Sequence, residues 1–83
     1  MAGFNTEIVH NGVNFHVQTQ DMGMSAKYIE SIIYKSGKVL SSKRTFYTNF
    51  LGTPDLREKI KAIIKDQHDT ILQEIREGKL DHL

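Results

Sequence analysis

Apolar and polar residues alternate along the first twenty positions of the chain. The alternation predicts two strands, residues 4–10 and 13–20, because neighbouring side chains of a strand point to opposite faces of a sheet. Asn11-Gly12 separates these runs and is the strongest short signal for a hairpin with a two-residue turn. Such a turn pairs His10 with Val13 and gathers the large apolar side chains on one face of the hairpin.

A second pair of runs, residues 27–35 and 38–48, flanks Ser36-Gly37 and predicts another hairpin. A tight turn there pairs the strands as follows: Tyr34 with Val39, Ile33 with Leu40, Ser31 with Ser42 and Glu30 with Lys43. Neither face of this hairpin is cleanly polar. One face holds Ile29, Ile33, Leu40 and Phe46, and the other holds Tyr28, Ile32, Tyr34 and Val39. A single helix hides one face only, so the second is either a contact patch or is closed by Phe50, Leu51 and the C-terminal tail.

The last third of the chain predicts one amphipathic helix over residues 54–77. Thr53 is a suitable cap, Pro54 fits the first helical position, and Gly78 is typical of the residue that follows a helix. The order of elements therefore predicts an α+β fold in a single domain, residues 1–83. Its architecture is a four-stranded antiparallel β-meander followed by one long C-terminal α-helix packed on one face.

The apolar stripe of the predicted helix changes direction halfway along. At about 100° per residue, Leu56, Ile60 and Ile63 share one face. A second group centres roughly 90° away and consists of Ile64, His68, Ile71 and Ile75, with Leu72 further round. One interpretation is a helix that wraps around its own twisted sheet. The alternative is that the second group forms a seam against another helix, such as that of a second copy.

The seam hypothesis defines a predicted protein interface. It combines residues of the helix and of the second hairpin, namely Ile64, His68, Ile71, Leu72, Ile75, Tyr28, Ile32 and Tyr34. Dimerisation suits a chain of 83 residues, since domains of this size bury only about 60 to 65% of their unfolded surface.

Composition narrows the class of protein further. The chain has no cysteine, which excludes disulfides and thiolate zinc sites. Nothing in it resembles a signal peptide or a membrane span, so we expect a cytoplasmic protein that does not enter a membrane. The formal net charge of +1 gives no overall attraction to nucleic acid or to anionic lipid.

The candidate chemistry is sparse. The four histidines, at positions 10, 16, 68 and 82, lack the spacing of helical zinc sites, because no second ligand stands four residues from His68. The serines lie in predicted strands or turns without the setting of a catalytic nucleophile, and no glycine-rich phosphate loop is present. We therefore expect no catalytic residue, no metal and no cofactor, and we predict that the chain is not an enzyme.

Nucleic-acid binding is the alternative function. Basic and aromatic residues gather around the second hairpin in the combination that single-strand binders use, and the candidate contacts are Lys35, Lys38, Lys43, Arg44 and Tyr47. Lysines on an edge strand also serve to block aggregation. The leading hypothesis remains a small non-enzymatic protein-interaction module. We expect a homodimer, or a subunit or adaptor that binds another protein through the C-terminal helix and the second hairpin.

A spaced set of residues resembles a small uncharacterised bacterial protein family. The set comprises Asn11-Gly12, His16-Val17-Gln18-Thr19-Gln20-Asp21, Gly37, Tyr47 and Gln67-His68. The resemblance covers most of the chain and brings no activity or partner with it. It singles out the run from His16 to Asp21 and the pair Gln67-His68. Within the run, alternate residues share the polar face of the second strand, which is either solvated or hydrogen-bonded to a partner.

Overall fold

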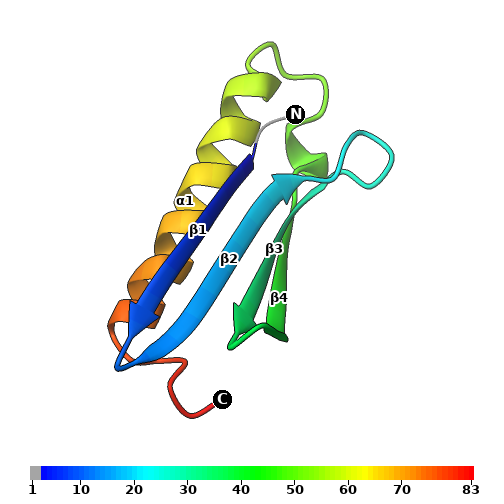
Figure 1. The fold of residues 1–83 in the computed structure, drawn as a ribbon. Coiled ribbons are helices and arrows are strands. Elements are labelled where there is room, and N and C mark those ends of the chain that lie inside the picture. Colours follow the sequence, from blue (N-terminus) through cyan, green and yellow to red (C-terminus); the bar gives the residue numbers. More distant parts are fainter. Residues whose placement is uncertain (1–2) are drawn as a thin grey trace.

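A computed structural model describes residues 3–83 of the chain, and it confirms the predicted α+β meander. One antiparallel sheet has the strand order β1-β2-β3-β4 (Figure 1). The strands are β1 (Gly3–His10), β2 (Val13–Asp21), β3 (Tyr28–Lys35) and β4 (Lys38–Phe46). The helix α1 (Leu56–Arg76) lies along one face of this sheet, over β1, β2 and β3. The molecule is elongated and measures 44 × 20 × 19 Å.

The first hairpin has the predicted turn and register. Asn11 and Gly12 both have positive φ angles, 50° and 77°, which define a type I′ turn. His10 pairs with Val13, and the predicted pairing continues without a shift to Phe4 opposite Thr19. The turn and the alternation were therefore sufficient to place every side chain of these two strands.

The second hairpin departs from its predicted register after one pair. Tyr34 faces Val39 as expected, but a bulge follows and Ile33 faces Ser41, so Leu40 is an extra residue. The shift moves the later pairs by one position, and Glu30 faces Arg44 instead of Lys43. It also corrects the predicted faces, because Phe46 lies opposite Tyr28 and away from the helix. Leu40 itself still packs against the core.

The predicted ends of the second hairpin and of the helix shift by one or two residues. β3 begins at Tyr28 because Lys27 has a φ angle of 62°, and β4 ends at Phe46, before a short 3₁₀ helix, η1 (Thr48–Phe50). The Thr53 hydroxyl donates to the carbonyl of Phe50 at 2.6 Å, so it does not cap α1, which begins two residues after Pro54.

The C-terminal end of α1 is closed by the predicted glycine. Gly78 has a φ angle of 78°, and its N–H donates to the carbonyl of Ile75 at 3.0 Å. The N–H of Lys79 donates to the carbonyl of Glu74 at 3.1 Å. These two bonds form a Schellman motif, which satisfies carbonyls that the end of a helix leaves unpaired.

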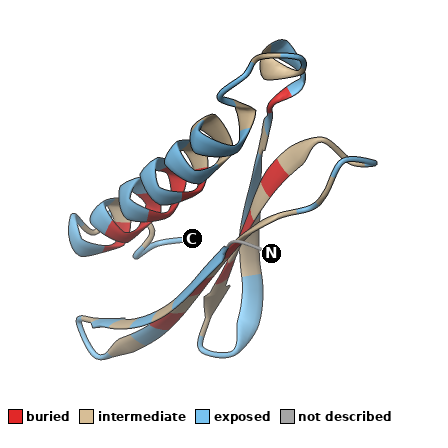
Figure 2. Cartoon of the chain, turned by 90° about the horizontal axis from the view of Figure 1, so that it is seen from above, coloured by how far each residue is buried: buried red, intermediate tan, exposed pale blue. Residues whose placement is uncertain are grey.

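The core lies between α1 and the sheet and consists of two apolar clusters. The larger contains Phe15, Val17, Ile33, Ile71, Leu72 and Ile75. The smaller contains Ile29, Tyr47 and Ile64, with Phe50, Leu51, Leu56, Ile60 and Ile63 packed against it. The buried residues of the helix lie along its side facing the sheet (Figure 2).

This burial corrects the helical part of the predicted interface. The five residues assigned to a seam are at most 7% exposed under the chain's own sheet, namely Ile64, His68, Ile71, Leu72 and Ile75. They are therefore not available to a second helix on the folded chain. The rotation of the apolar stripe has a simpler physical cause. The sheet is twisted and the helix is straight, so the residues that contact the sheet shift gradually around the helix from one end to the other.

Candidate functional site

A belt of polar side chains crosses the core between the two apolar clusters. Each strand contributes one hydroxyl and α1 contributes two adjacent side chains, so the buried polar belt consists of Thr6, Thr19, Ser31, Thr45, Gln67 and His68. Among the described residues, no buried side-chain nitrogen or oxygen lacks a hydrogen-bond partner. The belt therefore avoids the cost of buried unpaired polar groups.

The imidazole of His68 connects β1 and β2 at one end of the belt. Its Nε2 lies 2.8 Å from the Thr6 hydroxyl and its Nδ1 lies 2.8 Å from the Thr19 hydroxyl. Thr19 continues to Ser31, with 2.6 Å between the two hydroxyl oxygens. The Phe4 ring covers the imidazole, with 5.4 Å between the ring centroids.

Gln67 completes the belt toward β4. Its amide nitrogen donates to the Ser31 hydroxyl at 2.8 Å and to the carbonyl of Lys43 at 3.3 Å, and its amide oxygen accepts from the Thr45 hydroxyl. Adjacent residues of a helix point in different directions. Here His68 reaches toward β1 and Gln67 reaches toward β4.

The hydrogen bonds of the belt can all run in one direction when His68 is neutral. Gln67 donates to Ser31, Ser31 to Thr19, Thr19 to Nδ1 of His68, and Nε2–H of His68 to Thr6. A protonated imidazole would donate from both nitrogens, so Thr19 would have to accept from His68. One of the two hydroxyl protons of Thr19 and Ser31 would then have no acceptor in the belt. The pKa of His68 lies below its usual value because burial disfavours the charged form, against a smaller opposing effect of Asp69.

Tyr47 connects the end of β2 to the chain after β4. Its hydroxyl donates to Oδ1 of Asp21 at 2.8 Å and lies 3.0 Å from the carbonyl of Gly23. The side chain is fully buried. Burial, followed by the hydrogen bond and the charge of Asp21, raises the pKa of Tyr47 to about 12. The prediction that Tyr47 contacts nucleic acid is therefore wrong, because no base can reach its buried ring.

The raised pKa of Tyr47 predicts a loss of stability in alkali. The unfolded tyrosine ionises near pH 10 while the folded one stays neutral to about 12, so the free energy of unfolding should fall by up to about 1.4 kcal/mol per pH unit across that range. Urea unfolding at pH 9 and pH 11 measures the change. Tyr47→Phe should remove this part of the pH dependence, whereas Tyr34→Phe should keep it. Equal pH dependence in the Tyr47→Phe variant would contradict the assignment.

The other candidate nucleic-acid contacts do not share one face. Nζ of Lys35 lies 2.8 Å from the carbonyl of Asp81 and 3.1 Å from that of Leu83, which ties it to the C-terminal tail. Lys38 lies opposite Lys35, and Lys43 lies opposite Ser31 on the helix side of β4. Arg44 is on the other face. Its Nε donates to Glu30 at 2.9 Å.

The face of the sheet away from α1 carries an apolar strip along the second hairpin. The open strip is made of Tyr28, Ile32, Tyr34, Val39 and Phe46. Val39 and Phe46 are 65% and 56% exposed, and the three β3 residues are half-buried. The prediction that Phe50, Leu51 and the tail close this face is wrong. Phe50 and Leu51 pack against the smaller core cluster, and Leu80 of the tail packs against the larger one. The hairpin half of the predicted interface is thus on the surface.

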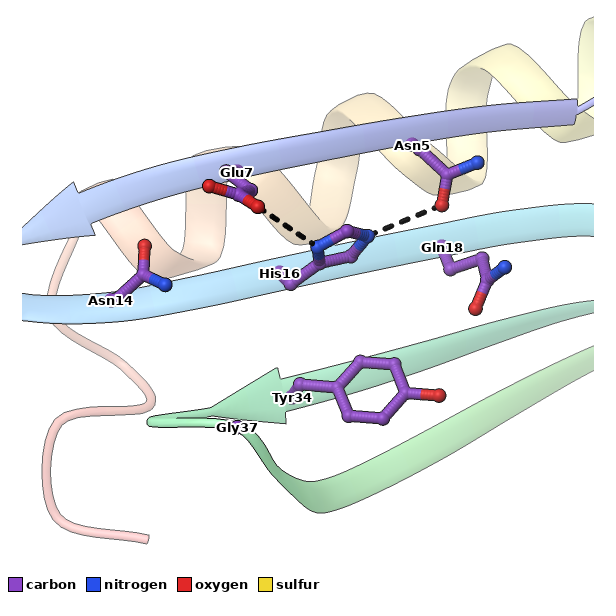
Figure 3. A pocket seen from close by; sticks show the side chains of 7 residues that line it. All are labelled: Asn5, Glu7, Asn14, His16, Gln18, Tyr34 and Gly37. Atoms are coloured by element: carbon purple, nitrogen blue, oxygen red, sulfur yellow. Dashed lines mark hydrogen bonds and ion pairs between the residues drawn. The ribbon is translucent and has the colours of Figure 1, made fainter.

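Beside the open strip, the first hairpin and Tyr34 form a shallow polar cavity of about 420 Å³ (Figure 3). His16 lies at its centre, with Nδ1 3.6 Å from Oε1 of Glu7 and Nε2 3.2 Å from Oδ1 of Asn5. The Tyr34 ring meets the imidazole edge-on, with 5.8 Å between centroids. The cavity offers hydrogen bonds, but neither serine nor threonine lines it.

The described residues contain no candidate for a metal site or for a membrane-spanning helix. In residues 3–83, no three histidine or acidic side chains are close enough together to hold a metal ion. Over the same residues, no helix has the length and apolar character needed to span a membrane.

The residues of the family resemblance divide between these features. Thr19, Gln67 and His68 belong to the buried polar belt, and Asp21 and Tyr47 hold the end of the sheet. His16, Gln18 and Gly37 line the polar cavity. Comparisons with protein-family models, with curated proteins and with solved structures gave no match for the chain.

Proposed function

We propose that the chain is a small non-enzymatic protein-interaction module that binds an amphipathic helix of a partner protein on the open strip. The observation that carries this proposal is the exposure of Val39 and Phe46 beside three further apolar side chains on a face that no described segment covers. Contiguous apolar patches rimmed by polar residues mark interaction sites on soluble domains. The polar cavity around His16 supplies such a rim on one side.

The size of the open strip fits one helix. Tyr28 and Tyr34 are six residues apart on β3, a span of about 20 Å, and the strip is two strands wide, or roughly 10 Å between its outer edges. A helix with its side chains is also about 10 Å wide, and four turns of it cover about 20 Å. The opposite face of the same sheet already carries α1 in this manner, so a second helix would complete three layers.

The charge of the open strip defines the chemistry of the partner. Arg44 and Glu30 are the charged residues on this face of the second hairpin. They lie between Phe46 and Ile32 and already pair with each other, with 2.9 Å between Nε of Arg44 and Oε2 of Glu30. A partner charge placed over the strip would lose water without gaining a counter-charge. We therefore expect aliphatic or aromatic contact residues on the partner helix, with its charged residues outside the contact.

A photo-crosslinker incorporated at position 46 of the full chain tests the proposal in the cells that make it. We expect one adduct, whose crosslinked peptide comes from an amphipathic helix with an uncharged apolar stripe. The purified pair should then bind at least tenfold more weakly with Ile32→Asp or with Val39→Asp, since central apolar contacts dominate such interfaces. Val39 is the more exposed of the two, so its variant should stay folded.

The matched controls are a crosslinker at position 57 and the Thr70→Asp variant, both at exposed positions of α1. The crosslinker at position 57 should not give this adduct, and Thr70→Asp should leave the binding of the purified pair unchanged. An adduct with twice the mass of the chain, an adduct that contains nucleic acid, equal adducts at positions 46 and 57, or no adduct would each overturn the proposal.

A further inference from the structure

The two edges of the sheet differ in their protection against pairing with another strand. β4 carries a bulge and the exposed lysines Lys38 and Lys43, features that discourage an incoming strand. β1 carries eight residues in regular pairing with β2 and has no proline, lysine, arginine or bulge. Both Phe4 and Val9 on this strand are exposed, by 45% and 68%. β1 is therefore the unprotected edge.

The turn determines which backbone groups of β1 face outward. A two-residue type I′ turn closes on a hydrogen-bonded pair, here His10 with Val13. Hydrogen-bonded and non-hydrogen-bonded pairs alternate along an antiparallel ladder. The outward N–H and C=O groups are therefore those of the alternate residues Gly3, Asn5, Glu7 and Val9. Among residues 3–83, β1 pairs with β2 alone, so these groups are free to bind a further strand.

A second copy of β1 fits this edge in one antiparallel register. With Thr6 at the twofold axis, Phe4 of one copy faces Ile8 of the other, and Asn5 faces Glu7. The outward groups of Asn5 and Glu7 then bond each other, and apolar side chains meet on the helix side. A register shifted by two toward the turn would place Glu7 against Glu7, which is a like-charge pair. The opposite shift would shorten the ladder to residues 3–7.

We propose that two copies of the chain pair through β1 in this register and form one continuous eight-stranded sheet. This surface is separate from the open strip and does not depend on its function. A twofold axis perpendicular to the sheet keeps equivalent faces together. Both α1 helices therefore lie on one side of the dimer, and both open strips lie on the other.

A cysteine at position 6 tests the register, because the chain has no cysteine of its own. Facing residues of a non-hydrogen-bonded pair lie about 4.5 Å apart at Cα, within the range of a disulfide. Thr6→Cys should form a disulfide-linked dimer under mild oxidation. Val9→Cys is the control, since Val9 faces Gly3 of the other copy and should crosslink far less. Equal crosslinking of the two variants would overturn the register.

Light scattering at high micromolar concentration tests the dimer itself. We expect the mass of two chains, and we expect Glu7→Pro to return it to one chain while circular dichroism keeps the folded spectrum. Proline removes only an outward N–H at this position, which an edge strand tolerates. A monomeric parent chain would overturn the proposal, and so would a dimer that folded Glu7→Pro leaves intact. If Glu7→Pro does not fold, Asn5→Pro provides the same test, because Asn5 is the residue that faces Glu7 of the other copy.

Discussion

Ile71→Asp should unfold the chain at 25 °C or lower its melting temperature by roughly 20 °C or more. Ile71 is 1% exposed and packs in the larger core cluster with Phe15, Val17 and Ile33. A carboxylate there has no cationic partner in the cluster and would cost about 4 kcal/mol or more. A chain of 83 residues has a total stability of about 4 to 12 kcal/mol, so this one change removes a large part of it.

Thr70→Asp is the matched control for this variant. It introduces the same charge one position earlier on α1, where the side chain is exposed, and it should change the free energy of unfolding by less than about 0.5 kcal/mol. Urea unfolding followed by circular dichroism compares the two. The seam hypothesis predicts instead that Ile71→Asp stays folded and loses only the binding of its partner. A folded Ile71→Asp monomer would therefore show that α1 does not pack as described.

Acidification should weaken the fold through His68. Its pKa in the folded chain lies below the value of about 6.5 in the unfolded chain. Below pH 6.5 the unfolded chain thus binds a proton that the folded chain does not. The contribution of His68 to the free energy of unfolding is fully present above pH 6.5. As the pH is lowered below 6.5, the free energy of unfolding should fall by up to about 1.4 kcal/mol per pH unit until the pKa of folded His68 is reached.

The His68→Gln variant separates this effect from the titration of carboxylates. The variant should be less stable at pH 7, because it removes the imidazole that contacts Thr6 and Thr19. Glutamine is uncharged at both pH values, so the variant should lose less stability between pH 7 and pH 5 than the parent. His16→Gln, which changes a histidine on the open face, should keep the pH dependence of the parent. Chemical denaturation at both pH values gives the comparison. Parallel pH profiles for the parent and His68→Gln would show that His68 accepts its proton without cost in the folded chain.

The sequence predicted the fold to the level of strand order because its signals were local. Asn11-Gly12 fixed one hairpin completely, through a turn that needs two positive φ angles. The bulge at Leu40 escaped prediction, because alternation remains plausible on either side of it until the packing partner is known. The consequence was a wrong face for Phe46, which belongs to the open strip.

The buried polar belt was harder to predict than the fold. Gln67 and His68 were visible as a polar interruption of the helix's apolar side, and Thr19 and Ser31 stood at core-facing positions of their strands. Their mutual contacts join residues up to 62 positions apart, and no local pattern reports such a distance. The signal that could have found the belt is the presence of at least one hydroxyl on the helix-facing side of each strand.

The belt also limits the ways in which this chain can misfold. A strand that slides by two residues against its neighbour keeps its apolar side chains on the same side, so hydrophobic burial alone distinguishes the two arrangements poorly. The slide would carry Thr19 or Ser31 along the sheet, out of reach of Gln67 and His68, and would leave Gln67 or His68 buried without a partner, at a cost of about 1 to 3 kcal/mol for each group. Six polar side chains thus give a small apolar core a single preferred alignment.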